Sequence, residues 1–112
     1  MDCIFCKIIE GEIPSKAVYN DELVFAFYDV SPKAPVHILI VPKKHIVSVN
    51  DFTVDDNALL AHIFDVAKQI AKRKGISESG YRLIFNTGKD AGQTVFHAHL
   101  HILGGDTLCD LG

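Results

Sequence analysis

The chain has 112 residues, of which 48% are hydrophobic and 22% are charged, and this composition favours a folded globular domain over a disordered chain. Its formal net charge of −3 gives no support to a protein that coats nucleic acid. No apolar run approaches the roughly 20 residues that span a bilayer, and residues 1–7 lack the basic and apolar regions of a signal peptide. We therefore expect one cytoplasmic domain over residues 1–112, with neither a nucleic acid nor a membrane as a partner.

The first half of the chain predicts a short helix and three strands. The helix is expected over residues 3–9, where apolar residues recur at helical spacing. A loop with two prolines precedes the third strand, because proline cannot donate to a sheet ladder. The strands are expected at residues 17–19, 23–28 and 36–41, the first two as a hairpin and the third at the centre of the sheet.

The second half predicts one long helix and two further strands. Thr53 can cap the start of the helix with Asp56 as its capping-box partner, and Gly75 can end the helix. His62 lies beside the apolar stripe of this helix, and we expect no function for it. The stripe is Leu60, Ile63, Phe64, Ala67, Ile70 and Ala71. Strands are expected at residues 81–85 and 95–103, so the order of elements predicts an α+β fold with one mostly antiparallel sheet.

Three of the six histidines, His97, His99 and His101, lie in the last expected strand. Successive side chains of a strand alternate between its faces, so all three imidazoles would share one face. Neighbouring imidazoles would start about 6.6 Å apart, and the outer two about 13 Å apart, so one metal ion could hold two of them but hardly three. This spacing predicts distinct roles for the three. The side chains expected in the core are Phe96, Ala98, Leu100 and Ile102.

His99, the central member of the row, is the predicted nucleophile. A neutral imidazole nitrogen can attack phosphorus and form a covalent phosphohistidine that water then hydrolyses. The other ring nitrogen needs an acceptor that fixes the tautomer, and a backbone carbonyl is one candidate. The preceding loop suits a phosphate, because glycine lets backbone N–H groups approach an anion, and neutral donors stand beside it. These loop residues are Gly88, Gly92, Gln93 and Thr94.

Cys3 and Cys6 form a Cys-x-x-Cys pair with the spacing of zinc ligands. A thioredoxin-like redox role is disfavoured because only two residues precede the pair, where that motif needs a strand. Zinc prefers four tetrahedral ligands, and His45 and His97 are the candidates for the other two. Such a closed site would be structural and would tie the N-terminus to the sheet. The alternative is two thiols without a metal. Cys109 is expected to be a free thiol.

Five stretches stand out together: residues 29–37, 42–46, 86–88, 92–94 and 97–105. On these stretches the chain resembles the histidine triad (HIT) superfamily, and within it the histidine triad nucleotide-binding branch. The likeness extends over essentially the whole chain, and its most specific part is the row of histidines together with the loop before it. The resemblance implies a HIT-like fold, with a five-stranded sheet, one long helix and one short helix, and a sheet that continues across a homodimer.

The resemblance also implies an activity and a set of site residues. Members of this branch bind purine nucleotides and hydrolyse nucleoside 5′-phosphoramidates such as adenylyl-amines, through a nucleotidyl group on the residue that matches His99. By the same pattern, His101 and Asn86 would contact the phosphate and ribose, and Gly92, Gln93 and Thr94 would line the phosphate and leaving-group region. Asp29 would hold the ribose hydroxyls, Val30, Phe5 and Phe27 would form the slot for the base, and His37 would support the triad.

Two departures from the family pattern bear on these expectations. The best-known members of the branch lack the Cys3-x-x-Cys6 pair, whereas some bacterial HIT hydrolases have it and bind zinc through it, with partners that match His45 and His97. Thr94 stands where serine is more usual, and the hydroxyl is kept.

Two other functions are compatible with the sequence. The first is a nucleotide-binding regulatory protein with little catalysis. The second is a zinc hydrolase that uses two triad histidines, but the two cysteines argue against it because they would leave no open position for water.

Overall fold

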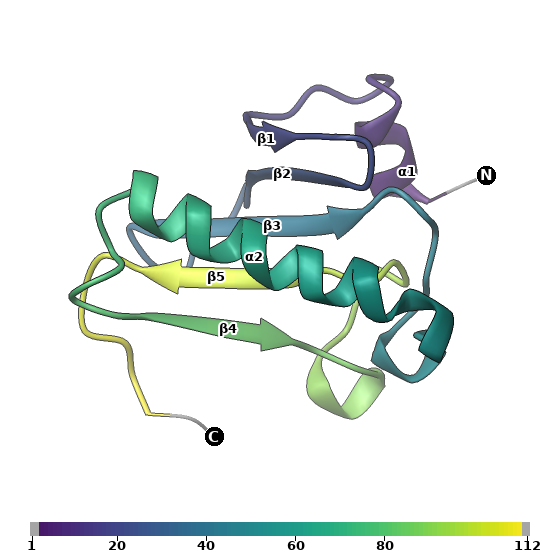
Figure 1. The fold of residues 1–112 in the computed structure, drawn as a ribbon. Coiled ribbons are helices and arrows are strands. Elements are labelled where there is room, and N and C mark those ends of the chain that lie inside the picture. Colours follow the sequence, from purple (N-terminus) through teal and green to yellow (C-terminus); the bar gives the residue numbers. More distant parts are fainter. Residues whose placement is uncertain (1–2, 111–112) are drawn as a thin grey trace.

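The computed structural model describes residues 3–110, and five antiparallel strands form its one sheet in the order β1-β2-β3-β5-β4 (Figure 1). Each strand pairs with its neighbour in antiparallel register, so the expected sheet is confirmed. None of the helices within this range is long and apolar enough to cross a membrane. In chain order the elements are α1 (Ile4–Ile9), β1 (Ala17–Asn20), β2 (Val24–Tyr28), β3 (Val36–Pro42), α2 (Asn57–Arg73), β4 (Tyr81–Phe85) and β5 (Leu100–Gly104), with 3₁₀ turns at Val49–Asp51, Val54–Asp56 and Lys89–Ala91.

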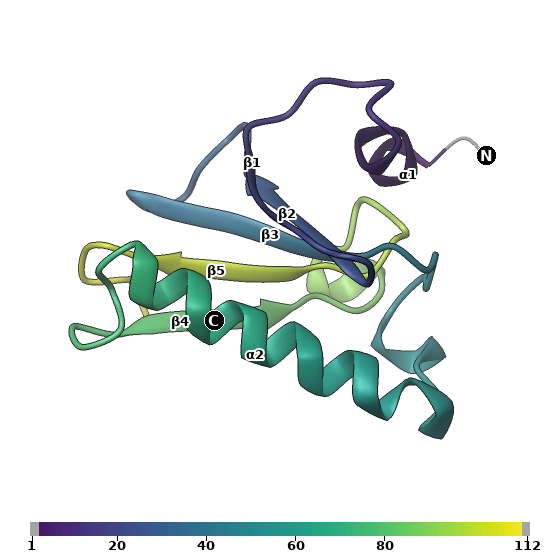
Figure 2. The same ribbon diagram turned by 45° about the horizontal axis from the view of Figure 1, so that its top comes forward.

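The sheet separates two apolar clusters, with α2 on one face and α1 on the other (Figure 2). The alternation along β3 produces this division, since Ile38 and Ile40 pack under α2 while Leu39 and Val41 face α1. β3 is therefore buried on both faces, as a central strand should be. The α1 face is also the face on which the candidate site lies.

The start of α2 differs in detail from the expectation. Thr53 and Asp56 do form a capping box, but it closes the 3₁₀ turn that precedes the helix, and α2 begins at Asn57. Phe64 was expected in the buried stripe and is 38% exposed, whereas Val66 is fully buried. The buried stripe is thus rotated slightly around the helix, and Phe64 packs against Phe85 at its margin.

The expected strand over residues 95–103 is wrong in its first half. β5 begins at Leu100, so His97 and His99 precede the strand, and Phe96 is 57% exposed instead of lying in the core. Pairing with β3 ends at Ile40 and Leu100, because Pro42 has no N–H to extend the ladder. The Pro42 carbonyl instead accepts a hydrogen bond from the His97 ring, at 2.7 Å. The chain therefore joins the sheet only after the first two histidines, His97 and His99.

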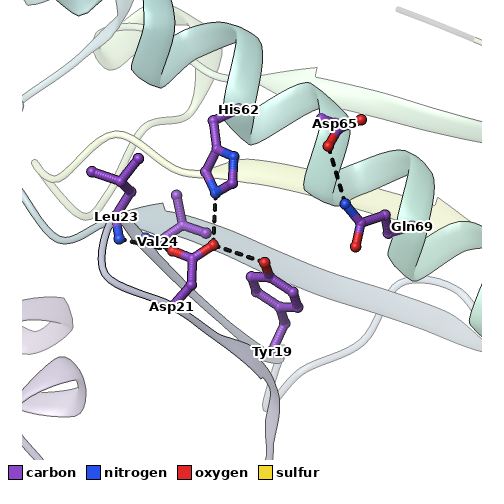
Figure 3. Close-up of polar contacts among 7 residues, drawn as sticks. All are labelled: Tyr19, Asp21, Leu23, Val24, His62, Asp65 and Gln69. Atoms are coloured by element: carbon purple, nitrogen blue, oxygen red, sulfur yellow. Dashed lines mark hydrogen bonds and ion pairs between the residues drawn. The ribbon is translucent and has the colours of Figure 1, made fainter.

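Asp21, in the turn between β1 and β2, ties this hairpin to α2 (Figure 3). One carboxylate oxygen accepts from the Tyr19 hydroxyl and contacts the His62 ring, at 2.7 and 2.6 Å. The other oxygen accepts the backbone N–H groups of Leu23 and Val24. Burial raises the pKa of Asp21, but these hydrogen bonds together lower it well below its ordinary value. His62, for which no function was expected, therefore has a structural partner.

We predict that Asp21→Ala lowers the free energy of unfolding by about 1–3 kcal/mol, because it removes the acceptor of several partly buried donors. His62→Gln serves as the matched comparison, since it keeps the turn and should cost about 1 kcal/mol or less. Urea unfolding at neutral pH measures both. Equal stability of Asp21→Ala and the unmodified protein would show that the network contributes nothing. Because the pKa of Asp21 is lowered in the folded state, its contribution is present above the ordinary carboxyl pKa and is lost on acidification.

Candidate active site and metal centre

A cavity of about 390 Å³ opens on the α1 face of the sheet, beside the ends of β2 and β5. Its walls come from α1, β2, β3, β5 and the loop before β5, so they draw on segments far apart in the sequence. A wider groove of about 670 Å³ adjoins it at Asp29 and Val30 but does not include His99 or His101. The predicted site residues that line the cavity are Phe5, Phe27, Asp29, Val30, Asn86, Gly92, Thr94, His99 and His101.

His99 is held in the tautomer that a nucleophile needs. Its Nδ1 lies 2.7 Å from the carbonyl oxygen of His97, and because a carbonyl only accepts, Nδ1 carries the proton. Nε2 therefore keeps its lone pair. Burial lowers the pKa of His99 below its ordinary value, against the opposing effects of the His97 carbonyl and the Asp29 charge. The side chain is thus a neutral imidazole at pH 7, and the edge-on ring of Phe5 is 5.0 Å away between centroids.

His37 and His101 form a hydrogen-bonded pair whose proton positions follow from the backbone. The Lys33 N–H donates to His37 Nδ1 at 3.0 Å, so His37 must carry its own proton on Nε2. His37 Nε2 lies 2.9 Å from His101 Nδ1 and donates to it, which leaves the proton of His101 on Nε2. The amide nitrogen of Asn86 lies 3.5 Å from that nitrogen, and because both then carry protons, neither accepts a hydrogen bond from the other. His101 therefore presents an N–H in the cavity.

Both members of this pair are neutral at pH 7. Burial lowers the pKa of His37, with a smaller effect of Lys33 in the same direction and an opposing effect of Asp29. Burial, followed by the charges of His99 and His37, lowers the pKa of His101 to about 4. Asp29, His37 and His101 also lie close enough together to be considered as metal ligands. The Lys33 N–H argues against that role, because it leaves His37 Nε2 protonated and without a lone pair for a metal.

The lowered pKa of His101 predicts a pH dependence of stability. The groups that face His101 are His37, His99 and Asp29. Between pH 6.5 and about 4 the unfolded chain binds a proton at this residue and the folded chain does not, so stability falls as pH drops through that window. Between pH 7.5 and pH 5 we expect a loss of about 1–2 kcal/mol from this group, after discounting for its partial exposure. Urea unfolding at both pH values measures the loss. A His101→Asn variant with the same loss would contradict the assignment.

Four candidate ligands come together from α1 and the residue before it, from the segment after β3 and from the segment before β5, with their ligand atoms all within 4.8 Å of one another: Cys3, Cys6, His45 and His97. His97 Nδ1 lies 3.3 Å from the sulfur of Cys3 and 3.6 Å from that of Cys6, and His45 Nδ1 lies 3.3 Å from Cys6. A tetrahedral zinc ion with its usual bond lengths separates sulfur and nitrogen ligands by about 3.6 Å. These three separations between sulfur and nitrogen are close to those of a tetrahedral metal centre.

The chemistry of the donor set also fits a metal ion. His97 donates from Nε2 to the Pro42 carbonyl, so its Nδ1, which faces the two sulfurs, keeps its lone pair. Burial, and then the neighbouring Cys3, raise the pKa of the Cys6 thiol to about 11. A thiolate is unfavourable there unless a cation compensates its charge. The residues therefore fit a four-coordinate zinc-type ion held by all four side chains.

The side chain of Gln93 does not join the other predicted residues in the cavity wall. Its amide nitrogen donates to the carbonyls of Val47 and Val95, at 2.7 and 3.1 Å, and its amide oxygen accepts the Gly88 N–H at 2.9 Å. The amide thus holds the loop together, and the role beside the phosphate expected for Gln93 stays a prediction. Gly92 has a φ of 87°, which favours glycine, and it brings the backbone to the cavity.

Sequence reasoning offered a backbone carbonyl as one acceptor for His99, but it did not identify which backbone groups act on the histidines. The Lys33 N–H, the His97 carbonyl and the Pro42 carbonyl set the proton positions of three imidazoles. The identity of a residue does not reveal which backbone groups will form such hydrogen bonds, since nearly every residue has an N–H and a carbonyl. The predicted set of apolar residues in the cavity wall was also incomplete, because five further apolar side chains line the cavity: Ile4, Ile8, Ile13, Leu39 and Val95.

Comparison with known proteins identifies the family. The sequence pattern of the HIT domain matches residues 10–108. The chain belongs to the HIT family. This HIT protein is 51% identical over 107 residues to the purine nucleoside phosphoramidase of Escherichia coli strain K12, a match that covers 96% of this chain and 90% of the relative.

Solved structures agree with this membership. A HIT family hydrolase from Legionella pneumophila Philadelphia 1 superimposes with a TM-score of 0.95 at 51% identity, covering 96% of both chains. A histidine triad protein from Clostridium difficile gives a TM-score of 0.96 at 51% identity, covering 100% of this chain and 97% of that one. The predicted HIT-like fold is therefore confirmed.

Proposed function

We propose that this HIT protein is a hydrolase that cleaves purine nucleoside 5′-phosphoramidates, such as adenylyl-amines, to a nucleoside monophosphate and an amine. The observation that carries the proposal is the state of His99, a neutral imidazole with its proton fixed on Nδ1 and its Nε2 available in a nucleotide-sized cavity. The name of the E. coli relative, a purine nucleoside phosphoramidase at 51% identity, supports the substrate class.

The proposed reaction has two displacements at phosphorus. His99 Nε2 attacks the phosphorus atom, the P–N bond to the amine breaks, and the amine leaves with a proton from water. In the second displacement the hydroxide left by that water attacks phosphorus and the bond between phosphorus and His99 Nε2 breaks, which releases the nucleoside monophosphate and restores the neutral imidazole. His101 donates its Nε2–H to a phosphate oxygen, and His37 keeps His101 in the required tautomer.

The rest of the cavity would bind the nucleotide. We assign the purine to the apolar slot of Phe5, Phe27 and Val30, and the ribose hydroxyls to the Asp29 carboxylate. Asn86, Gly92 and Thr94 would contact the phosphate or the leaving group. The division follows from chemistry, since a purine needs an apolar slot and an anion needs N–H and O–H donors.

We further propose that Cys3, Cys6, His45 and His97 hold a structural zinc ion. When bound, zinc supplies no catalytic step there, because four protein ligands close its coordination sphere and leave no position for water. The site would fasten α1 to the sheet, and this view disfavours a zinc hydrolase.

The homodimer implied by the family resemblance remains part of the proposal. β4 is an edge strand of the sheet, with its backbone available for pairing to a second copy. Phe52 and Phe64 flank Phe85 of β4 and would add an apolar contact. Sedimentation equilibrium tests the assembly, and a monomer at micromolar concentration would contradict it.

A steady-state assay tests the function. Purified protein is incubated with adenosine 5′-phosphoramidate and with the guanosine analogue, and release of the nucleoside monophosphate is followed by chromatography. We expect multiple turnovers on at least one of the two. Tight binding of AMP or GMP with no turnover would instead identify a nucleotide-binding regulatory protein, and would contradict the hydrolase proposal.

A further inference from the structure

The metal centre and the nucleotide cavity share two structural elements. The first is α1, a helix of six residues whose preceding residue, Cys3, and third residue, Cys6, are both metal ligands. Between these ligands in the sequence stands Phe5, which is 6% exposed and lines the cavity. α1 lies on the face of the sheet opposite α2 (Figure 2), so α2 cannot hold it in place.

Phe5 connects the two sites through ring contacts. Its ring meets that of His99 edge to face, with centroids 5.0 Å apart and an interplanar angle of 87°. The same ring packs against the metal-ligand candidate His97 at 6.0 Å and against Phe27, which also lines the cavity, at 5.6 Å. The position of α1 therefore determines both one wall of the base slot and the packing of the nucleophile.

His97 is the second shared element. Its ring Nδ1 faces the sulfurs of the metal centre, and its Nε2 donates to the Pro42 carbonyl. Its backbone carbonyl accepts the Nδ1–H of His99 and thereby sets the tautomer of the nucleophile. One fully buried residue thus belongs to the metal centre by its side chain and to the catalytic site by its backbone.

We propose that metal binding at Cys3, Cys6, His45 and His97 and nucleotide binding in the cavity are thermodynamically coupled, with Phe5 as the positioning residue that carries the coupling. The inference rests on the proposed nucleotide and metal sites and gives the metal a role beyond stability. Metal loading fixes α1 and the His97 ring, and so presents a finished base slot and an oriented His99 to the ligand. Coupling is reciprocal, so a bound nucleotide must tighten the metal by the same factor.

The test measures two affinities and compares their changes. AMP binding is measured by calorimetry on zinc-loaded protein and on protein kept in excess chelator, with circular dichroism recorded for both. Zinc affinity is measured by competition with a chromogenic chelator, with and without saturating AMP. We expect zinc to tighten AMP binding by about five- to a hundredfold, and AMP to tighten zinc by the same factor. Equal AMP affinity with and without zinc would overturn the proposal.

Substitution of Phe5 separates positioning from a merely structural effect. Phe5→Leu keeps an apolar side chain and all four metal ligands, so zinc affinity without AMP should change little while the coupling factor falls toward one. Lys7→Ala, on the same helix but outside the cavity wall, is the matched control and should keep the coupling. A coupling factor in Phe5→Leu equal to that of Lys7→Ala would refute the role of Phe5.

A kinetic measurement covers the case in which chelated protein loses its fold. The rate of zinc transfer from the folded, loaded protein to the chelator is then compared with and without AMP. AMP should slow the transfer in the unmodified protein and in Lys7→Ala but not in Phe5→Leu; the same slowing in all three would refute the coupling through Phe5. None of these readouts uses turnover. A protein that binds AMP but hydrolyses no phosphoramidate would refute the hydrolase proposal and leave this inference open to the same test.

Discussion

Replacing His99 with alanine is expected to abolish phosphoramidate hydrolysis, with kcat lowered by roughly 10⁴-fold or more. The loss is large because the proposed covalent route has no other nucleophile. His97 Nδ1 faces the metal centre, and His101 uses Nδ1 to accept from His37 and carries a proton on Nε2. AMP affinity should change by less than tenfold, because the apolar slot and Asp29 stay in place. Steady-state turnover and calorimetry measure the two quantities.

A matched histidine and a trapped intermediate sharpen this prediction. His62→Ala removes a histidine that pairs with Asp21 outside the cavity, so its turnover should match that of the unmodified protein. Mixing enzyme with substrate and quenching in alkali should reveal one nucleotidyl group on His99 by peptide mass analysis, since a phosphohistidine bond is labile in acid. Turnover by His99→Ala within tenfold of the unmodified enzyme would exclude the covalent route.

Local sequence patterns predicted most of the fold because the responsible forces are local. The β-branched run of β3 and the glycine after α2 specify a central strand and a helix end without reference to distant residues. The strand assigned to residues 95–99 failed for a non-local reason. Alternation of side chains predicted an extended strand, but a ladder also needs a partner, and β3 offers none beyond Ile40.

Some residues of the candidate site could be predicted from local sequence alone, and others only from the family resemblance. The candidate metal ligands followed from spacing and ligand chemistry, and the structure brings Cys3, Cys6, His45 and His97 together. Asp29, His37 and Asn86 instead required the family resemblance, because nothing in their local sequence places them beside His101. Gln93 was assigned by the same route, and the hydrogen bonds of its side-chain amide with the backbone of Gly88 and Val47 are contacts that its local sequence does not predict.

Removing the metal is expected to cause the largest loss of stability. Reconstituted protein should contain one zinc ion per chain, and excess chelator should lower the free energy of unfolding by about 4 kcal/mol if free zinc had been a thousandfold above its Kd. For a domain of this size the loss corresponds to a fall in Tm of about 15 °C. The physical reason is that Cys3 and Cys6 would fasten α1, a short helix whose only buried side chains are Phe5 and Ile8.

Two cysteine variants decide whether this loss comes from the proposed metal centre. Cys6→Ser removes a ligand, so its melting temperature should equal that of chelated protein and should not fall further on chelation. Cys109→Ser removes an exposed cysteine outside the ligand group, and it should keep both the bound zinc and the response to chelator. Calorimetry with metal analysis of each sample measures these outcomes. Two outcomes would contradict a structural zinc centre. One is that the unmodified protein takes up no zinc on reconstitution. The other is that it loses its zinc while its Tm moves by less than about 2 °C, because emptying a site that links α1 to the sheet must loosen the contact of Phe5 with His99.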